Sequence, residues 1–148
     1  WKAKNLITVT PGNATDYNFI KKDISRLYEN GVLHNVYYDR FNSSQLVIDL
    51  SEMGIPMVKM GQGFMDMNTP VKDIEMQLLN SNVQHGNNPI FLWMMGNVKV
   101  QYNENQDQKL SKKHSNGKID GVVAWAMARK ANIDEMNEYS EGPGVFII

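Results

Sequence analysis

The segment from Lys118 to Lys130 constrains this chain most, because it joins a helix with a buried face to a single acid at the helix start. Apolar side chains recur in it at helical spacing: Ile119, Val122, Val123, Ala126 and Met127. Such a helix packs one face against a core, so its first turn has a fixed place in the fold. Asp120 stands at that turn, where a carboxylate gains from the helix dipole and can accept backbone N–H groups. Spacing alone favours helix capping over catalysis for Asp120.

The composition limits the classes of protein to which the chain can belong. Its 148 residues, 42% of them hydrophobic, predict one globular domain with a core. The absence of cysteine excludes disulfides and thiolate metal sites and favours a reducing, intracellular setting. No apolar run approaches the length of a membrane span, and the first five residues lack a signal-peptide pattern. A net charge of −1 argues against coating nucleic acid by bulk charge, but it leaves room for a local basic patch.

The first part of the chain alternates predicted strands and helices. Strands are expected at residues 6–10, 32–39 and 55–60, and helices at residues 15–30 and from Asn42 or Ser43 to Gly54. The strand, helix, strand order implies two parallel neighbours in an α/β sheet. Asp39 ends the first of these two strands, at the carboxyl edge where such sheets bind ligands. An Asx-type turn explains Asp39 equally well at this stage.

The middle of the chain carries a turn and further helix signals. Gly61-Gln62-Gly63 is expected to be a plain turn, although such a segment could let a backbone approach a phosphate. Thr69 as N-cap and Pro70 at the first helical position predict a helix that runs to Asn80. The next elements are expected to be a buried helix from Pro89 to Gly96 or Asn97 and a strand at residues 98–102.

Polar segments lie on both sides of the helix that Asp120 opens. Residues 103–116 are expected to form a solvated loop with basic side chains just before Asp120, namely Lys109, Lys112, Lys113 and His114. After Arg129 the composition turns acidic and then small. Residues 131–148 are therefore predicted to be a linker or partly ordered tail, which leaves residues 1–130 as the domain.

Asp39 and Asp120 are far apart in the sequence but can converge at the edge of an α/β sheet. Convergent carboxylates repel each other unless a cation lies between them. A site with oxygen donors alone suits Mg²⁺ or Mn²⁺ rather than zinc. Two such ions can activate a water and stabilise the leaving oxygen of a phosphodiester when three or more acids surround them, and the sequence offers two acids here.

Several motifs occur in a family-specific order, and together they carry a resemblance. They are Tyr38–Asn42, Gly61–Phe64, His85–Pro89, Trp93-Met94, Asn97-Val98 and Lys118–Ala124. In order and spacing, over about residues 1–130, the chain resembles the nuclease half of tailed-phage large terminase subunits. The resemblance implies a ribonuclease-H-like α/β fold, a mixed sheet flanked by helices. It also implies a metal-dependent endonuclease that cuts concatemeric double-stranded viral DNA into genome lengths during packaging.

The resemblance assigns roles residue by residue. Asp39 and Asp120 match the catalytic acids that hold Mg²⁺ or Mn²⁺, and the DNA-binding lysine of the preceding loop falls at Lys112 or Lys113. The implied partners are double-stranded DNA, the terminase small subunit and the portal protein, with no membrane. The implied setting is the cytoplasm of a bacterium that hosts the phage or carries it as a prophage.

The sequence also departs from the family pattern. The family's first acid lies on the opening strand of the nuclease fold, whereas residues 6–10 resemble a later strand. We therefore expect an N-terminally truncated domain without the first acid or the ATPase half, and no Gly-x-x-x-x-Gly-Lys-Ser/Thr motif is found. Such a fragment is expected to be inactive alone and to self-associate through its open sheet edge. The alternative is a non-enzymatic DNA-binding or portal-docking module in which both acids are caps.

Overall fold

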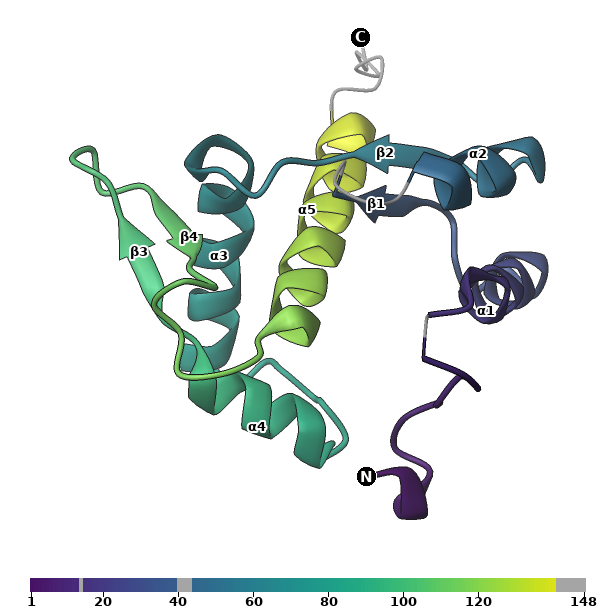
Figure 1. Ribbon diagram of the computed structural model, residues 1–148. Helices are drawn as coiled ribbons and strands as arrows, with labels where there is room; N and C mark the ends of the chain where they lie inside the picture. Colours follow the sequence, from purple (N-terminus) through teal and green to yellow (C-terminus); the bar gives the residue numbers. More distant parts are fainter. Residues whose placement is uncertain (14, 40–43, 141–148) are drawn as a thin grey trace, which may run out of the picture.

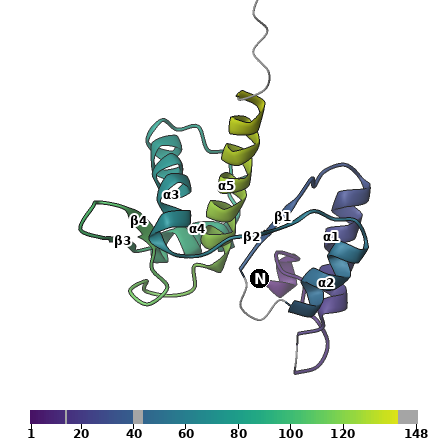
Figure 2. The same ribbon diagram turned by 90° about the horizontal axis from the view of Figure 1, so that it is seen from above.

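The computed structural model describes residues 1–13, 15–39 and 44–140, and it shows an α/β fold (Figure 1). Its elements are a 3₁₀ turn at Lys2–Lys4, α1 (Tyr17–Glu29), β1 (Val36–Tyr38), α2 (Ser44–Glu52), β2 (Met57–Lys59), α3 (Phe64–Leu79), α4 (Pro89–Asn97), β3 (Val100–Tyr102), β4 (Gln108–Leu110) and α5 (Asp120–Ser140). Helix α5 lies between α3 on one side and the part formed by α1, α2, β1 and β2 on the other (Figure 2). The predicted α/β class is confirmed.

Strands β1 and β2 form a parallel pair joined by α2, as the strand, helix, strand order predicts. Tyr37 lies opposite Val58 in this pair. The Met60 N–H donates to the Tyr38 carbonyl at 2.9 Å and so extends the pairing past the end of β2. This bond places the residue after β1, Asp39, beside the turn that follows β2. The predicted N-cap of α2, Asn42 or Ser43, lies outside the described residues.

Strands β3 and β4 form an antiparallel hairpin, where the sequence analysis expects a strand and then a solvated loop. The Asn103 side-chain oxygen accepts the N–H groups of Asn105 (3.0 Å) and Asp107 (2.8 Å), which closes the hairpin tip. Asn68 of α3 donates to Asp107 at 2.9 Å and accepts the Gln108 N–H, also at 2.9 Å. The prediction of a loop was wrong for β4 because these bonds come from a residue 40 positions away in the sequence.

Helix α3 begins at Phe64 rather than at the predicted Thr69, with Gly63 in an extended conformation before it. Pro70 lies in the second turn, where it cannot donate the backbone bond that an interior helical residue normally makes. Burial of apolar side chains offsets the loss of this hydrogen bond, since Met67 and Pro70 are both almost fully enclosed. The local start signal was therefore overridden by packing.

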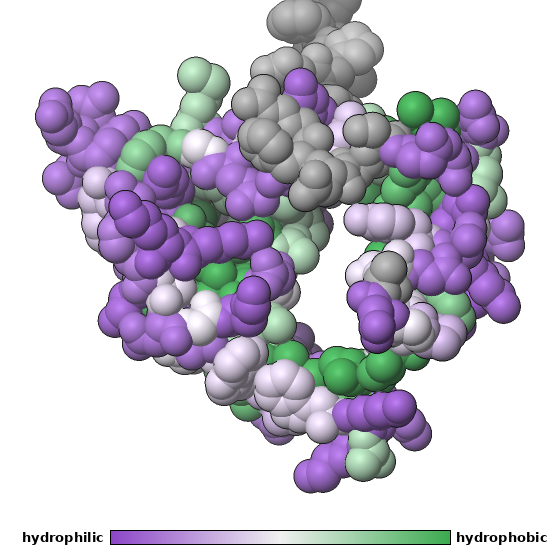
Figure 3. Space-filling model, in the orientation of Figure 1, coloured by the Kyte–Doolittle hydropathy of each residue, from purple (hydrophilic) through white to green (hydrophobic). Residues whose placement is uncertain are grey.

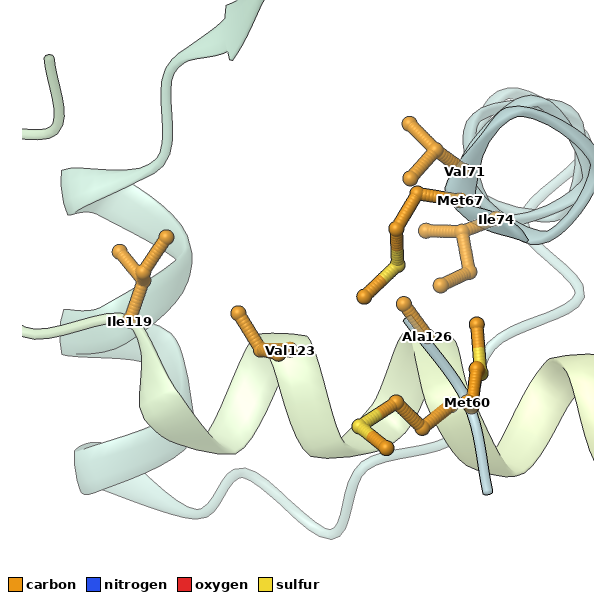
Figure 4. Close-up of a cluster of buried hydrophobic side chains, with 8 residues drawn as sticks. Met60, Met67, Val71, Ile74, Ile119, Val123 and Ala126 are labelled. Atoms are coloured by element: carbon orange, nitrogen blue, oxygen red, sulfur yellow. The ribbon is translucent and has the colours of Figure 1, made fainter. Parts of the chain in front are cut away.

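The main core lies between α3 and α5 (Figure 4). Its buried members are Met60, Met67, Val71, Ile74, Ile119, Val123, Ala126 and Met127. At the edge of this core, Arg129 Nε of α5 donates to Asp73 Oδ2 of α3 at 2.7 Å. The hydrogen bond from Arg129 holds the pKa of Asp73 below its ordinary value. Both the apolar contacts and this ion pair fix α5, and with it Asp120, relative to α3.

Three further expectations differ from the structure. Residues 6–10 form no strand in the described chain, and both Ile7 and Val9 are exposed. Helix α4 has the predicted bounds, with Asn88 as its cap, but it lies at the periphery and has no buried residue. Helix α5 continues to Ser140, through a segment expected to be a linker. The division into a domain at 1–130 and a tail at 131–148 stays a prediction.

Candidate functional site

Asp120 is the first residue of α5, and its side chain is 60% exposed. Its carboxylate Oδ1 lies 2.8 Å from Lys112 Nζ. The hydrogen bond from Lys112 is the main cause that lowers the pKa of Asp120, and the charges of Lys112 and Lys118 act in the same direction, whereas partial burial opposes them. Asp120 is therefore an accessible, ionised acid beside a cation.

The next three backbone N–H groups of α5 do not use the Asp120 carboxylate as their acceptor. The Gly121 N–H donates to Met94 Sδ at 3.2 Å. The next two N–H groups, of Val122 and Val123, both donate to the Ile119 carbonyl. The three N–H groups that follow Asp120 thus have other acceptors, and the carboxylate is directed to Lys112 instead.

Helix α4 braces the loop that leads into Asp120. Asn97 Nδ2 donates to the Lys118 carbonyl at 3.2 Å, and the Asn97 carbonyl accepts the Asn116 N–H at 3.1 Å. Gly117 packs so closely here that an added Cβ would lie 2.8 Å from Asn97 Nδ2. On the other side of Asp120, a Cβ on Gly121 would lie 2.9 Å from Met94 Sδ. These close contacts explain a glycine on each side of the acid.

The basic loop before α5 has a defined shape. Ser111 Oγ lies 2.8 Å from His114 Nδ1, and Ser115 Oγ donates to the Ser111 carbonyl at 2.7 Å. Of the two candidate lysines, the sequence could not say which one lies near the acid. In the structure Lys112 makes the contact with Asp120, whereas Lys113 is exposed. Asp120 and both Lys112 and Lys118 line one shallow hollow, which also includes Trp93 of α4.

Asp39 lies directly after β1 and lines a different hollow. Gln62 Nε2 donates to Asp39 Oδ2 at 2.6 Å. Asp66, in the first turn of α3, lines the same hollow. Neither Gln62 nor Asp66 was singled out from the sequence, although an acid just after a glycine-rich turn is a signal that could have indicated Asp66. The residues that an Asx turn at Asp39 requires lie outside the described part of the chain.

Asp39 and Asp120 are both anchored to the main core, but they lie at different heights along the axis of α5. Asp39 follows the Tyr38 carbonyl that Met60 binds, and Met60 packs near Ala126 (Figure 4). Ala126 comes six residues after Asp120, which corresponds to about 9 Å along a helix axis. Within residues 1–13, 15–39 and 44–140, no three acids or histidines gather into a metal-binding group. The donor type fits a hard cation, but these residues alone do not supply a complete ligand set.

A groove separates the two parts of the molecule, and an opening between them is visible in the space-filling view (Figure 3). Its apolar walls come from α1, the segment leading into β1, and α5, with Leu27, Val32, Ala124, Ala128 and Ala131 among the lining residues. Val32 is 71% exposed.

None of the helices that the structure describes has both the length and the apolar character needed to cross a membrane.

Comparison with known proteins identifies the family. The family model described as "Terminase large subunit, endonuclease domain" matches residues 1–135. The large terminase subunit of Enterobacteria phage HK97 is 34% identical over 140 residues, which cover 93% of this chain and 28% of that protein. Protein YmfN of Escherichia coli K12 is 29% identical over 130 residues, which cover 86% of this chain and 29% of that protein.

The solved structures agree with this result. The crystal structure of the HK97 large terminase matches with a TM-score of 0.79 at 34% identity, over 88% of this chain and 28% of that one. The chain thus spans less than a third of the length of these relatives. The family match covers most of the chain, and the fold agrees with it. This chain belongs to the family of terminase large subunit endonuclease domains.

Proposed function

We propose that this chain forms part of a metal-dependent endonuclease that cuts concatemeric double-stranded DNA during phage packaging. The observation that carries the proposal is the hollow at the start of α5, where the ionised Asp120 lies beside Lys112 and Lys118. An accessible carboxylate next to cations is suited to a site that must bind both a metal ion and a phosphate. The family match supports this use of the hollow.

We propose Asp39 and Asp120 as metal ligands, with Mg²⁺ or Mn²⁺ as the ion. When bound, such ions supply an activated water and stabilise the leaving oxygen of a phosphodiester. The described residues do not form a complete ligand set, so the proposal requires a further acid from the rest of a large subunit. It follows that this chain alone is inactive or nearly so.

The basic loop is proposed to hold the DNA backbone. Lys112 and Lys118 line the hollow with Asp120, Lys113 is exposed in the same loop, and lysines bind phosphates without reading the sequence of bases. Lys112 has three N–H donors, so those not bound to Asp120 can contact a phosphate, and a metal ion at Asp120 would weaken the ion pair because it would replace the positive charge.

The wider setting is proposed from the family. The partners are double-stranded DNA, the terminase small subunit and the portal protein, and the place is the cytoplasm of the host bacterium. The apolar groove beside β1 also supports the predicted self-association, because within the described residues β1 pairs with β2 alone. A species that stays monomeric in sedimentation at high concentration would contradict that expectation.

The direct test is DNA cleavage by a complete large subunit that carries this sequence. We expect Asp39→Asn and Asp120→Asn each to reduce Mn²⁺-dependent cleavage at least about 100-fold, because each removes a charged ligand while keeping side-chain size. Asp23→Asn is the matched control, since Asp23 is an exposed acid on α1 that pairs only weakly with Arg26. Cleavage retained by both site variants would refute the proposal and favour a non-enzymatic DNA-binding or portal-docking module.

A further inference from the structure

We propose that Gln62 is a positioning residue for Asp39: its side-chain amide fixes the carboxylate in the orientation that a metal ion requires. The inference rests on the proposed function, because it assigns Gln62 a role only if Asp39 is a ligand. The contact itself is short and direct, with Gln62 Nε2 donating to Asp39 Oδ2 at 2.6 Å. It joins two residues that are 23 positions apart in the sequence.

The turn that carries Gln62 is anchored in the core at both ends. On one side, Met60 is 3% exposed, and its N–H donates to the Tyr38 carbonyl at 2.9 Å. On the other side, the Gly63 carbonyl accepts the Met67 N–H at 3.0 Å, and Met67 is 1% exposed. Gln62 thus lies between two points that cannot move without disturbing the core, so its backbone has a fixed position beside Asp39.

The glycine before Gln62 leaves room for the side chain of Asp66. A Cβ at Gly61 would overlap the carboxylate oxygen Asp66 Oδ2. The Asp66 carboxylate, in the first turn of α3, therefore lies close to the backbone of Gly61. The Gly61-Gln62-Gly63 segment, expected from its sequence to be a plain turn, thus also carries the Gln62 side chain to Asp39.

The chemistry of an amide suits this role. A glutamine N–H binds one carboxylate oxygen without adding charge, so it does not compete with a cation for Asp39 as a lysine would. A hydrogen bond to an ionised acceptor also restricts the rotation of the carboxylate. Partners of metal ligands that act in this way typically change metal affinity 10- to 100-fold when they are removed.

The test is isothermal titration of Mn²⁺ into a complete large subunit that carries this sequence and into its variants, with thermal melts to confirm folding. Gln62→Met removes the amide but keeps the length of the side chain, and Gln62→Leu is a second variant should the first fold poorly. Gln45→Met is the matched control, since Gln45 Nε2 donates to Asp49 Oδ1 at 2.7 Å in α2, away from this hollow. We expect Gln62→Met to weaken Mn²⁺ binding about 10- to 100-fold, and Gln45→Met to bind as the unaltered subunit does.

An Asp39→Asn variant separates the two possible failures. If Asp39→Asn abolishes binding while Gln62→Met binds as tightly as the unaltered subunit, the inference about Gln62 is overturned and the proposed function stands. If Asp39→Asn leaves binding unchanged, or the unaltered subunit binds no Mn²⁺, the metal role of Asp39 is rejected, and the role of Gln62 with it. Equal loss in Gln62→Met and Gln45→Met would show a general effect on folding and would also overturn the inference.

Discussion

The burial of Met67 is the feature of the fold whose energetic consequence is easiest to measure. Met67 is 1% exposed and packs in the core between α3 and α5 (Figure 4). Met67→Ala removes three side-chain atoms beyond Cβ, which at about 0.8 kcal/mol per buried group corresponds to about 2.4 kcal/mol of transfer free energy. The remaining cavity raises the expected loss in the free energy of unfolding to about 3 kcal/mol, within the usual range of about 2–5 kcal/mol.

Met65 offers a matched control on the same helix, because its side chain is 92% exposed. We expect Met65→Ala to change the free energy of unfolding by less than about 0.5 kcal/mol. The assay is urea unfolding at pH 7, and in thermal melts Met67→Ala should lower Tm by about 6–12 °C. Equal effects of the two substitutions, or a loss below about 1 kcal/mol for Met67→Ala, would refute the early start of α3 that buries Met67.

Three further predictions concern side chains that define the ends and contacts of helices. Asp73→Asn should destabilise the fold by about 1–2 kcal/mol at pH 7 in urea unfolding. Because its α5 arginine lowers the pKa of Asp73 in the folded state, the difference in stability between the two proteins should shrink as the pH falls below 3.8. A difference that does not depend on pH would contradict this. Asn88→Ala should cost about 1 kcal/mol in the same assay, since Asn88 caps α4, and no loss would exclude the cap. Lys112→Met should raise the pKa of Asp120 in a carbon-13 NMR titration, whereas Lys113→Met should not; equal titration curves for the two variants would disprove the ion pair.

Features governed by neighbouring residues were predictable from the sequence. Helix α1 begins after Asp16, whose side chain accepts the Asn18 N–H at 2.9 Å, and α4 begins after Asn88. In both cases the capping residue and the helix it caps are adjacent in the sequence. The parallel pairing of β1 and β2 was also predictable, because the order and length of the elements between them allow few alternatives.

Features that depend on distant residues were not predictable in the same way. Residues 6–10 have the composition of a strand but no strand beside them in the described chain. Strand β4 has a polar sequence and is stabilised by Asn68 of α3. At the candidate site, Asp39 and Asp120 were singled out by their places at a strand end and a helix start and received their catalytic role from the resemblance. Gln62 was found only when the fold brought it to Asp39.

We propose that Asp39 and Asp120 serve one metal site, although they line different hollows and lie about 9 Å apart along the axis of α5. The most direct test is titration of Mn²⁺ into a complete large subunit with this sequence, into both single Asp→Asn variants and into the double variant, with thermal melts to confirm folding. The account predicts that each single substitution greatly weakens binding and that the double variant loses little more, because ligands of one site are not additive. Independent losses, or binding unaffected by Asp120→Asn, would show that the two acids do not share a site and would contradict the account.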